Sequence, residues 1–383
     1  MSVHACTCNK AGTDGRHGQP ASGGLAAAPV LTGYDCMAWS QRKLKHPNSP
    51  QQLRAIVLAL RISEHDMDLL EFFGKVQHRV DACLKARLAR LPAEPAELKE
   101  AMEYALLLGG KRARPLLVYA SGRACGASWE DLDYVAAAIE CIHSYSLIHD
   151  DMPEMDNDML RRGHPTVHAK YGAAAALLAG DTLQALAFDL LTDSNCRLAP
   201  DVKGRMCACL ARASGFEGMC GGQAIDLASE HKKLPQDQLE KLHSLKTGAL
   251  ITCAVQLGFM AGRYQEAWEN RQSDAIASAV GLVESNHMNR EFECLTEYGR
   301  KVGLAFQVWD DVLDVAGDTA VMGKNAGSDE SLEKSTYVTL MGLDAARAYA
   351  KQLADEAQAV LKKLSVDTDI LSQFAQFCVT RDH

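Results

Sequence analysis

The chain has 383 residues, 47% of them apolar, so it can bury one large core or two smaller ones. Its formal net charge of -9 argues against a nucleic-acid-binding surface but not against a small anionic ligand, which responds to local charge. No uninterrupted apolar window of 18 residues occurs, which predicts no membrane span. The 13 cysteines lack zinc-site spacing and are interpreted as reduced thiols of a cytoplasmic protein.

The first 66 residues differ in composition from the rest of the chain. They are rich in Gly, Ala, Pro and polar residues and show little periodicity, so residues 1–66 are predicted to be a disordered or non-native extension. Basic residues outnumber acidic ones among the first 50, which leaves a targeting segment as an alternative. The folded domain is predicted over residues 67–383, starting with the amphipathic segment "MDLLEFFGKVQHRVDACLKARL".

From residue 67 onwards, apolar residues recur at steps of three and four. Short Gly/Pro turns such as "LPAEP" and "KKLPQ" separate these segments, and no alternating strand pattern occurs. This pattern predicts an all-α fold of ten or more helices. Within "ALLLGGKRARPLLVYA", two helices are expected to meet at Gly109–Gly110.

An acidic run, "LIHDDMPEMDND", follows an apolar segment at Leu147–Asp158. It contains Asp150, Asp151 and Asp156, and on a straight helix Asp156 would point away from Asp150. Pro153 interrupts the helix between them, so a local bulge is expected to return Asp156 to the side of Asp150.

A second acidic cluster has the spacing of a single helix stripe. Gln307, Asp310, Asp311 and Asp314 stand at i, i+3, i+4 and i+7. Like charges at this spacing destabilise a helix by roughly 0.2–0.5 kcal/mol per pair, so a compensating cation is expected. Oxygen ligands without His or Cys favour Mg²⁺ over softer metals. One acidic run is more often a solvated face, but two after apolar helices favour a metal site.

Basic residues with turn chemistry lie near both clusters, as phosphate recognition requires. Each alone is more often surface charge, but together they frame the acidic helices. They stand in "GGKRARP" (Lys111, Arg112, Arg114), "LRRGHPT" (Arg161, Arg162), "LKTGAL" (Lys246, Thr247) and "GKNAGSDESLEKST" (Lys324, Lys334).

These motifs resemble, in the same order, those of the trans-isoprenyl diphosphate synthases, in particular the short-chain bacterial farnesyl diphosphate synthases. The resemblance covers about residues 67–383 and rests on "LLLGGKRARP", "IHSYSLIHDDMPEMDNDMLRRGHPTVH", "MCGGQAIDLASE", "HSLKTGALI", "GLAFQVWDDVLDVAGDTAVMGK" and "KSTY". It implies an isoprenoid-synthase-type helical bundle around a deep central cavity, and a homodimer. Relative to the family pattern, about residues 263–294 look like an insertion.

The resemblance also implies roles for individual residues. The six aspartates Asp150, Asp151, Asp156, Asp310, Asp311 and Asp314 would hold up to three Mg²⁺ ions on the allylic diphosphate. Arg161, Lys246 and Lys324 would contact the same diphosphate. The diphosphate of isopentenyl diphosphate would be bound by Lys111, Arg114, His143 and Arg162. The Lys246 carbonyl, Thr247 and Gln307 would stabilise an allylic carbocation.

Product length is expected to depend on the helix that precedes Asp150. Helix geometry places Ser146 beneath Asp150 and Tyr145 to its side. In the family an aromatic residue at the position of Tyr145 is associated with a C15 product. Farnesyl diphosphate is therefore predicted, with geranylgeranyl diphosphate as the alternative; Tyr145 as an ordinary core residue also remains open.

Three rival interpretations are less favoured. A terpene cyclase would need a different second motif from "DDVLD". A di-iron bundle could use the Glu-x-x-His pairs Glu140/His143 and Glu284/His287, but it gives the basic motifs no role. A non-catalytic prenyltransferase subunit would tend to lose its aspartates, and both motifs are intact here.

Overall fold

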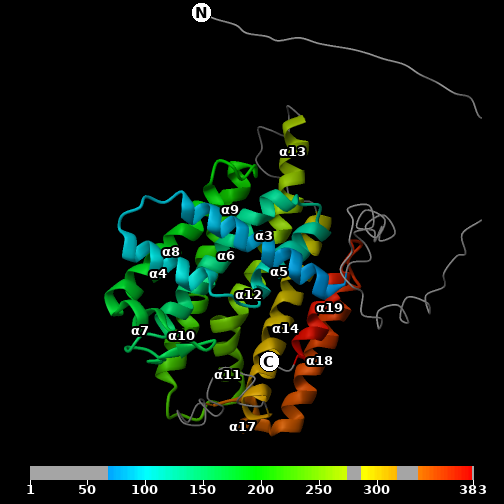
Figure 1. The fold of residues 1–383 in the computed structure, drawn as a ribbon. Helices are drawn as coiled ribbons and strands as arrows, with labels where there is room; N and C mark the ends of the chain where they lie inside the picture. Colours follow the sequence, from blue (N-terminus) through cyan, green and yellow to red (C-terminus); the bar gives the residue numbers. More distant parts are fainter. Residues whose placement is uncertain (1–67, 274–285, 317–334, 382–383) are drawn as a thin grey trace, which may run out of the picture. The chain divides into compact units, whose positions relative to one another are not determined.

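The computed structural model describes residues 68–273, 286–316 and 335–381, all within one unit that spans Ser63–His383. These residues are almost entirely helical (Figure 1). The only strands in the described ranges are β1 (Leu160–Arg161) and β2 (His164–Pro165), which form a short antiparallel hairpin. The predicted all-α fold is confirmed, while the prediction of a disordered extension at 1–66 falls outside the described residues.

The helices follow one another with short connections. The first half contains α3 (Leu69–Ala89), α4 (Ala96–Leu107), α5 (Ala113–Ala124), α6 (Trp129–Asp150), α7 (Val167–Tyr171) and α8 (Ala173–Thr192). Next come α9 (Pro200–Ser214), α10 (Met219–Ala228), α11 (Gln236–His243), the π-helical turn η2 (Ser244–Gly248), α12 (Ala249–Phe259) and a second π-helical turn, η3 (Met260–Tyr264). The last part contains α13 (Gln265–Ser273), α14 (Asn286–Ala316), α17 (Tyr337–Met341), α18 (Leu343–Leu361) and α19 (Asp369–Cys378).

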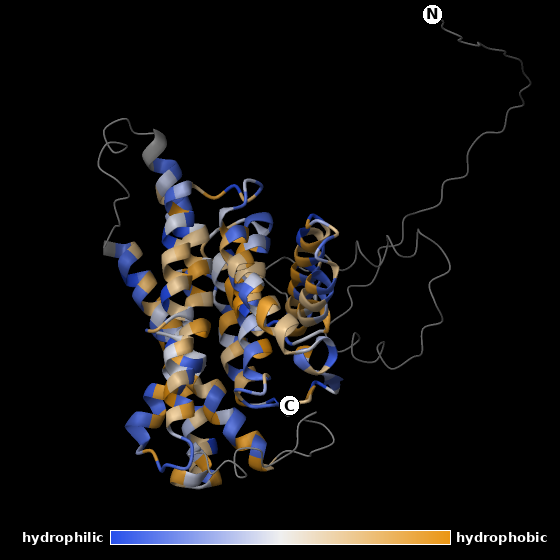
Figure 2. Ribbon diagram, turned by 90° about the vertical axis from the view of Figure 1, so that its left-hand side faces the viewer, coloured by the Kyte–Doolittle hydropathy of each residue, from blue (hydrophilic) through white to orange (hydrophobic). Residues whose placement is uncertain are grey.

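The first described helix shows how the sequence specifies these elements. Asp68 caps α3, because its carboxylate accepts a hydrogen bond from the backbone N–H of Glu71 at 2.8 Å. Apolar residues then recur every three or four positions along one buried side, at Leu69, Phe72, Val76, Val80, Leu84 and Leu88. Hydrophobic and hydrophilic residues alternate along most helices of the unit, as expected of amphipathic helices around a buried core (Figure 2).

The predicted turn between α4 and α5 is confirmed. Gly109 and Gly110 have φ values of 93° and 144°, which residues with a side chain rarely adopt. Gly110 also makes room for Arg162, since a Cβ there would lie 2.6 Å from the Arg162 Nη1 atom. The glycine pair therefore both reverses the chain and lets a basic residue from the hairpin approach it.

Helix α6 is buried on most sides and carries the first acidic motif at its C-terminal end. It packs against α5 and α8. Helix α12 connects this group to α14, which carries the second acidic motif and packs on α18. The two motifs therefore end long core helices, whose positions are fixed by apolar packing along their length.

The segment predicted as an insertion, at about 263–294, is helical throughout its described part. It includes the end of η3, all of α13, which rises above its neighbours in Figure 1, and the first turns of α14. Arg263 binds Glu291 through two contacts of 3.0 and 3.2 Å, which tie η3 to α14. From Glu291 to Asp310 the helix continues for about 28 Å without a break, so the acidic stripe keeps its helical geometry.

Two helical stretches, Ala173–Thr192 and Gln236–Asn270, are long and apolar enough on average to cross a membrane, although neither is uninterrupted by polar residues. Core helices of soluble proteins meet the same criterion, and 67% of the apolar window of the second stretch is buried inside the fold. The first stretch, α8, is only 44% buried over its window. These helices are therefore weak evidence for a membrane span. Part of the apolar side of α8 is not buried within the described fold.

Candidate active site

The first acidic motif lies where α6 ends. The helix stops at Asp150, and the backbone N–H of Asp156 donates to the Asp150 carbonyl at 2.9 Å. Asp156 thus returns to Asp150 as predicted, but the predicted bulge is wrong. The chain leaves the helix and turns back, because the ring of Pro153 cannot continue the helical hydrogen bonding.

The two adjacent aspartates of this motif have different environments. Asp151 is buried and accepts two 2.8 Å hydrogen bonds from Arg161 Nε, with a third from Nη2 at 2.5 Å. Burial raises the pKa of the Asp150 carboxyl to about 6; Lys246 opposes this shift and Asp156 adds to it. Asp150 is therefore a carboxylate whose charge the fold alone does not compensate.

The second acidic motif forms the predicted stripe on α14. Gln307 Nε2 donates to Asp311 Oδ1 at 3.2 Å, across one helical turn. The backbone N–H of Tyr337 donates to Asp311 Oδ2 at 2.8 Å, and the guanidinium of Arg381 binds Asp310. These contacts fix the orientation of two carboxylates in the absence of a ligand.

The second acidic motif was also predicted to include Asp314 and to lie near Lys324. Asp314 lies half-buried on α14, one turn beyond Asp310 and Asp311. Lys324 falls outside the described residues, so its predicted contact with a diphosphate stays a prediction.

The π-helical turn η2 connects the two acidic motifs. Thr247 Oγ1 donates to Gln307 Oε1 at 3.0 Å. Lys246 Nζ lies 2.5 Å from Asp226 Oδ2 and is the strongest opposing charge on Asp150. Turns of this kind are frequent at functional sites. The structure therefore brings Gln307 of α14 beside Lys246 and Thr247 of η2, which belong to a separate segment of the sequence.

Helix α10 approaches η2 unusually closely. A Cβ atom on Gly222 would lie 2.2 Å from the Lys246 backbone nitrogen and 2.6 Å from its Cα. No side chain fits there unless the two elements move apart. Gly222 thus sets the spacing that lets Asp226, one turn further along α10, reach the Lys246 ammonium.

The residues predicted to bind a second diphosphate are brought together in part. His143 and Arg162 line a small cavity of about 50 Å³, together with Arg161. Burial lowers the pKa of His143 well below its usual range, and Arg114 and then Arg162 lower it further. A neutral His143 leaves the charge of these arginines unbalanced, which suits an anionic ligand. Lys111 is exposed.

Arg112 and Arg114 have distinct roles although they are two residues apart. Arg112 is buried and binds Glu140 at 2.7 Å and Asp81 at 2.8 Å, so its charge is used within the fold. Arg114 Nε is buried and has no hydrogen-bond partner among the described residues. The pairing of Glu140 with Arg112 also removes one of the two Glu-x-x-His pairs that a di-iron site would need; Glu284 of the other pair falls outside the described residues.

The predicted chain-length residues lie on α6 below Asp150. Tyr145 is 5% exposed, and its hydroxyl contacts Cys220 Sγ at 3.5 Å. Ser146 is half-buried, and its Oγ donates to the His143 carbonyl at 2.8 Å, so its hydroxyl is used within the helix. Of the two side chains, Tyr145 is the larger and can contact more of an apolar product chain buried beside α6.

Several residues of the site were missed by sequence reasoning. Asp226 stands in the quoted segment "MCGGQAIDLASE", four residues after Gly222. His243 ends α11 with both ring nitrogens buried beside the side chain of Gln307, and burial lowers its pKa to about 4. Its position three residues before Lys246 was the available signal. Arg381 offered no local signal, because it lies 71 residues from Asp310.

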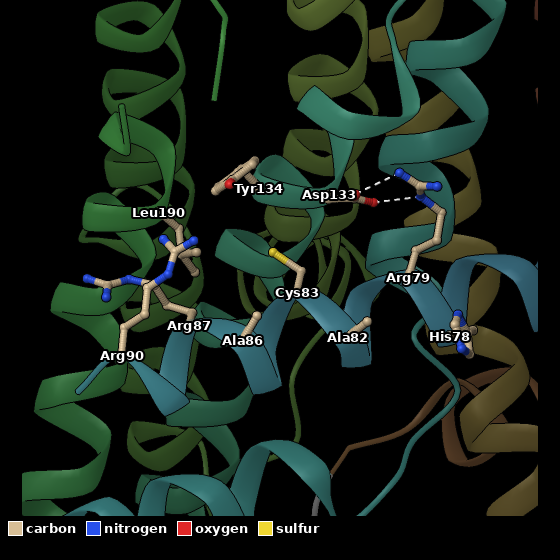
Figure 3. A pocket seen from close by; sticks show the side chains of 10 residues that line it. All are labelled: His78, Arg79, Ala82, Cys83, Ala86, Arg87, Arg90, Asp133, Tyr134 and Leu190. Carbon is tan, nitrogen blue, oxygen red and sulfur yellow. Dashed lines mark hydrogen bonds and ion pairs between the residues drawn. The ribbon is translucent and has the colours of Figure 1, made fainter. Parts of the chain in front are cut away.

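The predicted deep central cavity stays a prediction. The cavity beside His143 is smaller than the ~300–1,000 Å³ typical of ligand pockets. A larger pocket of about 310 Å³ lies elsewhere, between α3, α6 and α8 (Figure 3). Its charges are balanced, since Arg79 binds Asp133 at 2.7 Å and Arg87 binds Asp189. That pocket therefore lacks the unbalanced charge found at the acidic motifs.

The donor set of the two motifs fits Mg²⁺. It consists of carboxylate oxygens, which are the ligands this ion prefers. Within the described ranges, no three His, Cys, Asp or Glu side chains converge closely enough to hold a metal by themselves. Mg²⁺ usually retains several water ligands and binds through one or two carboxylates together with substrate phosphates.

Comparison with known proteins places the chain among enzymes of one kind. A family model described as polyprenyl synthetase matches residues 95–367. The farnesyl diphosphate synthase of Escherichia coli strain K12 is 46% identical over 318 residues, covering 79% of this chain and 98% of that protein. That of Geobacillus stearothermophilus is 40% identical over 314 residues, with coverages of 82% and 98%.

Solved structures agree with these relatives. An apo FPP/GFPP synthase from Zymomonas mobilis superposes with a TM-score of 0.68 at 38% identity, covering 82% of this chain and 99% of that one. A geranyltransferase from Helicobacter pylori, complexed with magnesium and isoprenyl diphosphate, gives a TM-score of 0.67 at 33% identity, with coverages of 82% and 97%.

We expect Asp150→Asn to stabilise the metal-free protein at neutral pH. The folded-state pKa of Asp150 is raised to about 6, so the wild type loses stability as pH rises from about 4 to 6 and its carboxyl ionises. The uncharged variant should then be more stable at pH 7 by on the order of 1–3 kcal/mol. Urea unfolding in EDTA measures this difference.

Asp355, exposed in the middle of α18, provides the control, since Asp355→Asn should change stability by less than ~0.5 kcal/mol. If Asp150→Asn were less stable than the wild type at pH 7 while this control behaved normally, Asp150 would not be an uncompensated carboxylate.

Proposed function

We propose that the chain is a farnesyl diphosphate synthase, because it belongs to the polyprenyl synthetase family and resembles enzymes of that name over most of its length. It condenses isopentenyl diphosphate with dimethylallyl diphosphate and then with geranyl diphosphate. Each condensation releases inorganic diphosphate. The observation that carries this assignment is the convergence of both acidic motifs on η2 beside a basic cavity. Geranylgeranyl diphosphate is the less favoured product.

The allylic diphosphate is placed between the two acidic motifs. When bound, Mg²⁺ supplies Lewis-acid neutralisation of the leaving diphosphate. The residues that would hold up to three such ions are Asp150, Asp151, Asp156, Asp310, Asp311 and Asp314. Arg161 and Lys246 add positive charge from the hairpin and from η2, and Lys324 is assigned to the same diphosphate.

Isopentenyl diphosphate is assigned to the basic side of the site. The guanidinium groups of Arg114 and Arg162 would bind its diphosphate, with Lys111 at the exposed edge. His143 is kept neutral by burial and by these arginines, so it can accept or donate one hydrogen bond without adding charge. The substrate charge would satisfy the buried Arg114 Nε, which lacks a partner among the described residues.

Condensation requires a cation to be stabilised between these two diphosphate sites. The allylic C–O bond breaks, and its electron pair leaves with the diphosphate. The double bond of isopentenyl diphosphate then attacks the carbocation, and the released diphosphate takes up the proton whose loss restores a double bond. The Thr247 hydroxyl donates a hydrogen bond to Gln307 Oε1, so the lone pairs of the Thr247 oxygen remain available to stabilise positive charge. The Lys246 carbonyl is assigned the same role, as a fixed dipole.

The growing chain is assigned to the space beneath Asp150, with Tyr145 and Ser146 at its floor. The buried ring of Tyr145 supports this assignment, because an apolar chain that extends down α6 would meet it. A floor at this depth limits the product to C15. We further place the enzyme in the cytoplasm, where its numerous thiols remain reduced.

A homodimer is proposed to form through α8 and the end of α9. Leu177 and Leu178 on α8 are 47% and 53% exposed, and Phe216, just after α9, is 92% exposed. Grouped exposed apolar residues of this size mark interaction surfaces. A second copy would also cover the exposed side of α8.

Product analysis tests the proposed activity. Full-length protein with Mg²⁺, isopentenyl diphosphate and dimethylallyl diphosphate should yield C15 as the main product by mass spectrometry. Tyr145→Ala should extend the product to C20 or longer, because it removes the floor. Wild type that stops at C20 would keep the activity but move the floor elsewhere. A folded, magnesium-supplied protein that forms no carbon–carbon bond would refute the assignment.

Sedimentation analysis tests the dimer. The wild type should sediment at twice its chain mass of 41.5 kDa, and Leu178→Lys combined with Phe216→Lys should sediment as a monomer. Leu70→Lys is the control, since Leu70 is 73% exposed on α3, outside the proposed surface. A double variant that remains dimeric would place the interface elsewhere.

A further inference from the structure

The hydroxyl of Tyr145 is held by groups from two other helices. It contacts Cys220 Sγ of α10 at 3.5 Å, and the side-chain amide of Gln184 on α8 is its second hydrogen-bond partner. The ring itself is buried in the core, whereas Cys220 and Gln184 are exposed. The polar end of the ring therefore reaches the edge of the core, where three helices meet.

The ring of Tyr145 is also supported along its side. The imidazole of His149 packs edge-on against it, with ring centroids 5.7 Å apart and an interplanar angle of 74°. His149 is itself positioned by α8, because its Nε2 lies 3.1 Å from the Leu177 carbonyl oxygen. With one contact at its side and two at its tip, the aromatic ring has little freedom to swing.

Helix α10 connects this ring to the reacting end of the site. Two residues after Cys220, Gly222 lies directly against the Lys246 backbone, and Asp226 binds the Lys246 ammonium. A movement of α10 would therefore affect both Lys246 and the partner of Tyr145. Gln223 lies between these residues, and both polar atoms of its side chain are buried without a partner in the described part of the chain.

We propose that Cys220 is a positioning residue for product length: its thiol, together with Gln184, holds Tyr145 in the orientation that stops the chain at C15. The inference rests on the proposed function, in which Tyr145 forms the floor. An unheld ring can rotate aside while a longer chain enters, so the C15 limit would depend on this contact as well as on the size of the side chain.

Variants that remove the contact but keep the ring test this proposal. Cys220→Ala and Tyr145→Phe should each raise the ratio of C20 to C15 product by about three- to tenfold, the range expected for one neutral hydrogen bond. The double variant should not exceed the larger single effect, because both changes remove the same contact. Cys220→Ser retains a hydrogen-bonding group and should keep the wild-type ratio.

The assay uses full-length protein with Mg²⁺, dimethylallyl diphosphate and excess isopentenyl diphosphate, and the C15 and C20 products are measured by mass spectrometry. Cys207→Ala is the matched control, because Cys207 is a half-buried thiol on α9. Total turnover of isopentenyl diphosphate should stay close to wild type in Cys220→Ala, Cys220→Ser and Cys207→Ala, since neither cysteine is assigned to a substrate. A general loss of structure would lower turnover without lengthening the product.

The outcomes distinguish the role of Cys220 from the proposed function on which it rests. If Tyr145→Ala lengthens the product but Cys220→Ala does not, Cys220 has no positioning role and the floor assignment stands. If an active Tyr145→Ala still stops at C15, both the floor and the role of Cys220 are wrong. If the wild type forms no product at all, the proposed activity itself fails.

Discussion

Negative charge concentrated at the ends of buried helices is the constraint on which the site depends. Asp150 shows its effect, because burial and the neighbouring Asp156 raise the pKa of its carboxyl to about 6. Charges taken out of water are costly unless they are paired, so each motif draws on a cation from a separate segment. Arg161 binds Asp151, and Arg381 binds Asp310. The remaining excess suits a divalent cation that arrives with a diphosphate.

The second requirement is that two long helices present their ends to the same small volume. The turn η2 meets it, since Thr247 bonds the Gln307 side chain while Lys246 acts on Asp150. Helix α10 packs against η2 at Gly222 and also reaches the hydroxyl of Tyr145 through Cys220. The chemistry at the top of the site and the product floor below it therefore share one supporting helix.

Features that depend on local sequence patterns were largely predicted. Contacts between residues far apart in the sequence were not. The i, i+4 spacing of Gln307 and Asp311 anticipated a hydrogen bond that the structure contains. The glycine turn at Gly109–Gly110 was equally local. The path of the chain after Asp150 could not be predicted in the same way, because either a bulge or a turn can return Asp156 to the side of Asp150. The pairing of Arg381 with Asp310 joins residues 71 positions apart, and no periodicity reports such a contact.

The most direct test of the central claim is calorimetric titration of inorganic diphosphate into the full-length protein, with Mg²⁺ and then with EDTA. The account predicts at least about tenfold tighter binding with Mg²⁺ than with EDTA, and loss of this Mg²⁺-dependent gain in both Asp150→Asn and Asp310→Asn, because each motif contributes oxygen ligands to the same clamp. Equal affinity with and without Mg²⁺, or a loss confined to one motif, would contradict a clamp formed by both acidic helices.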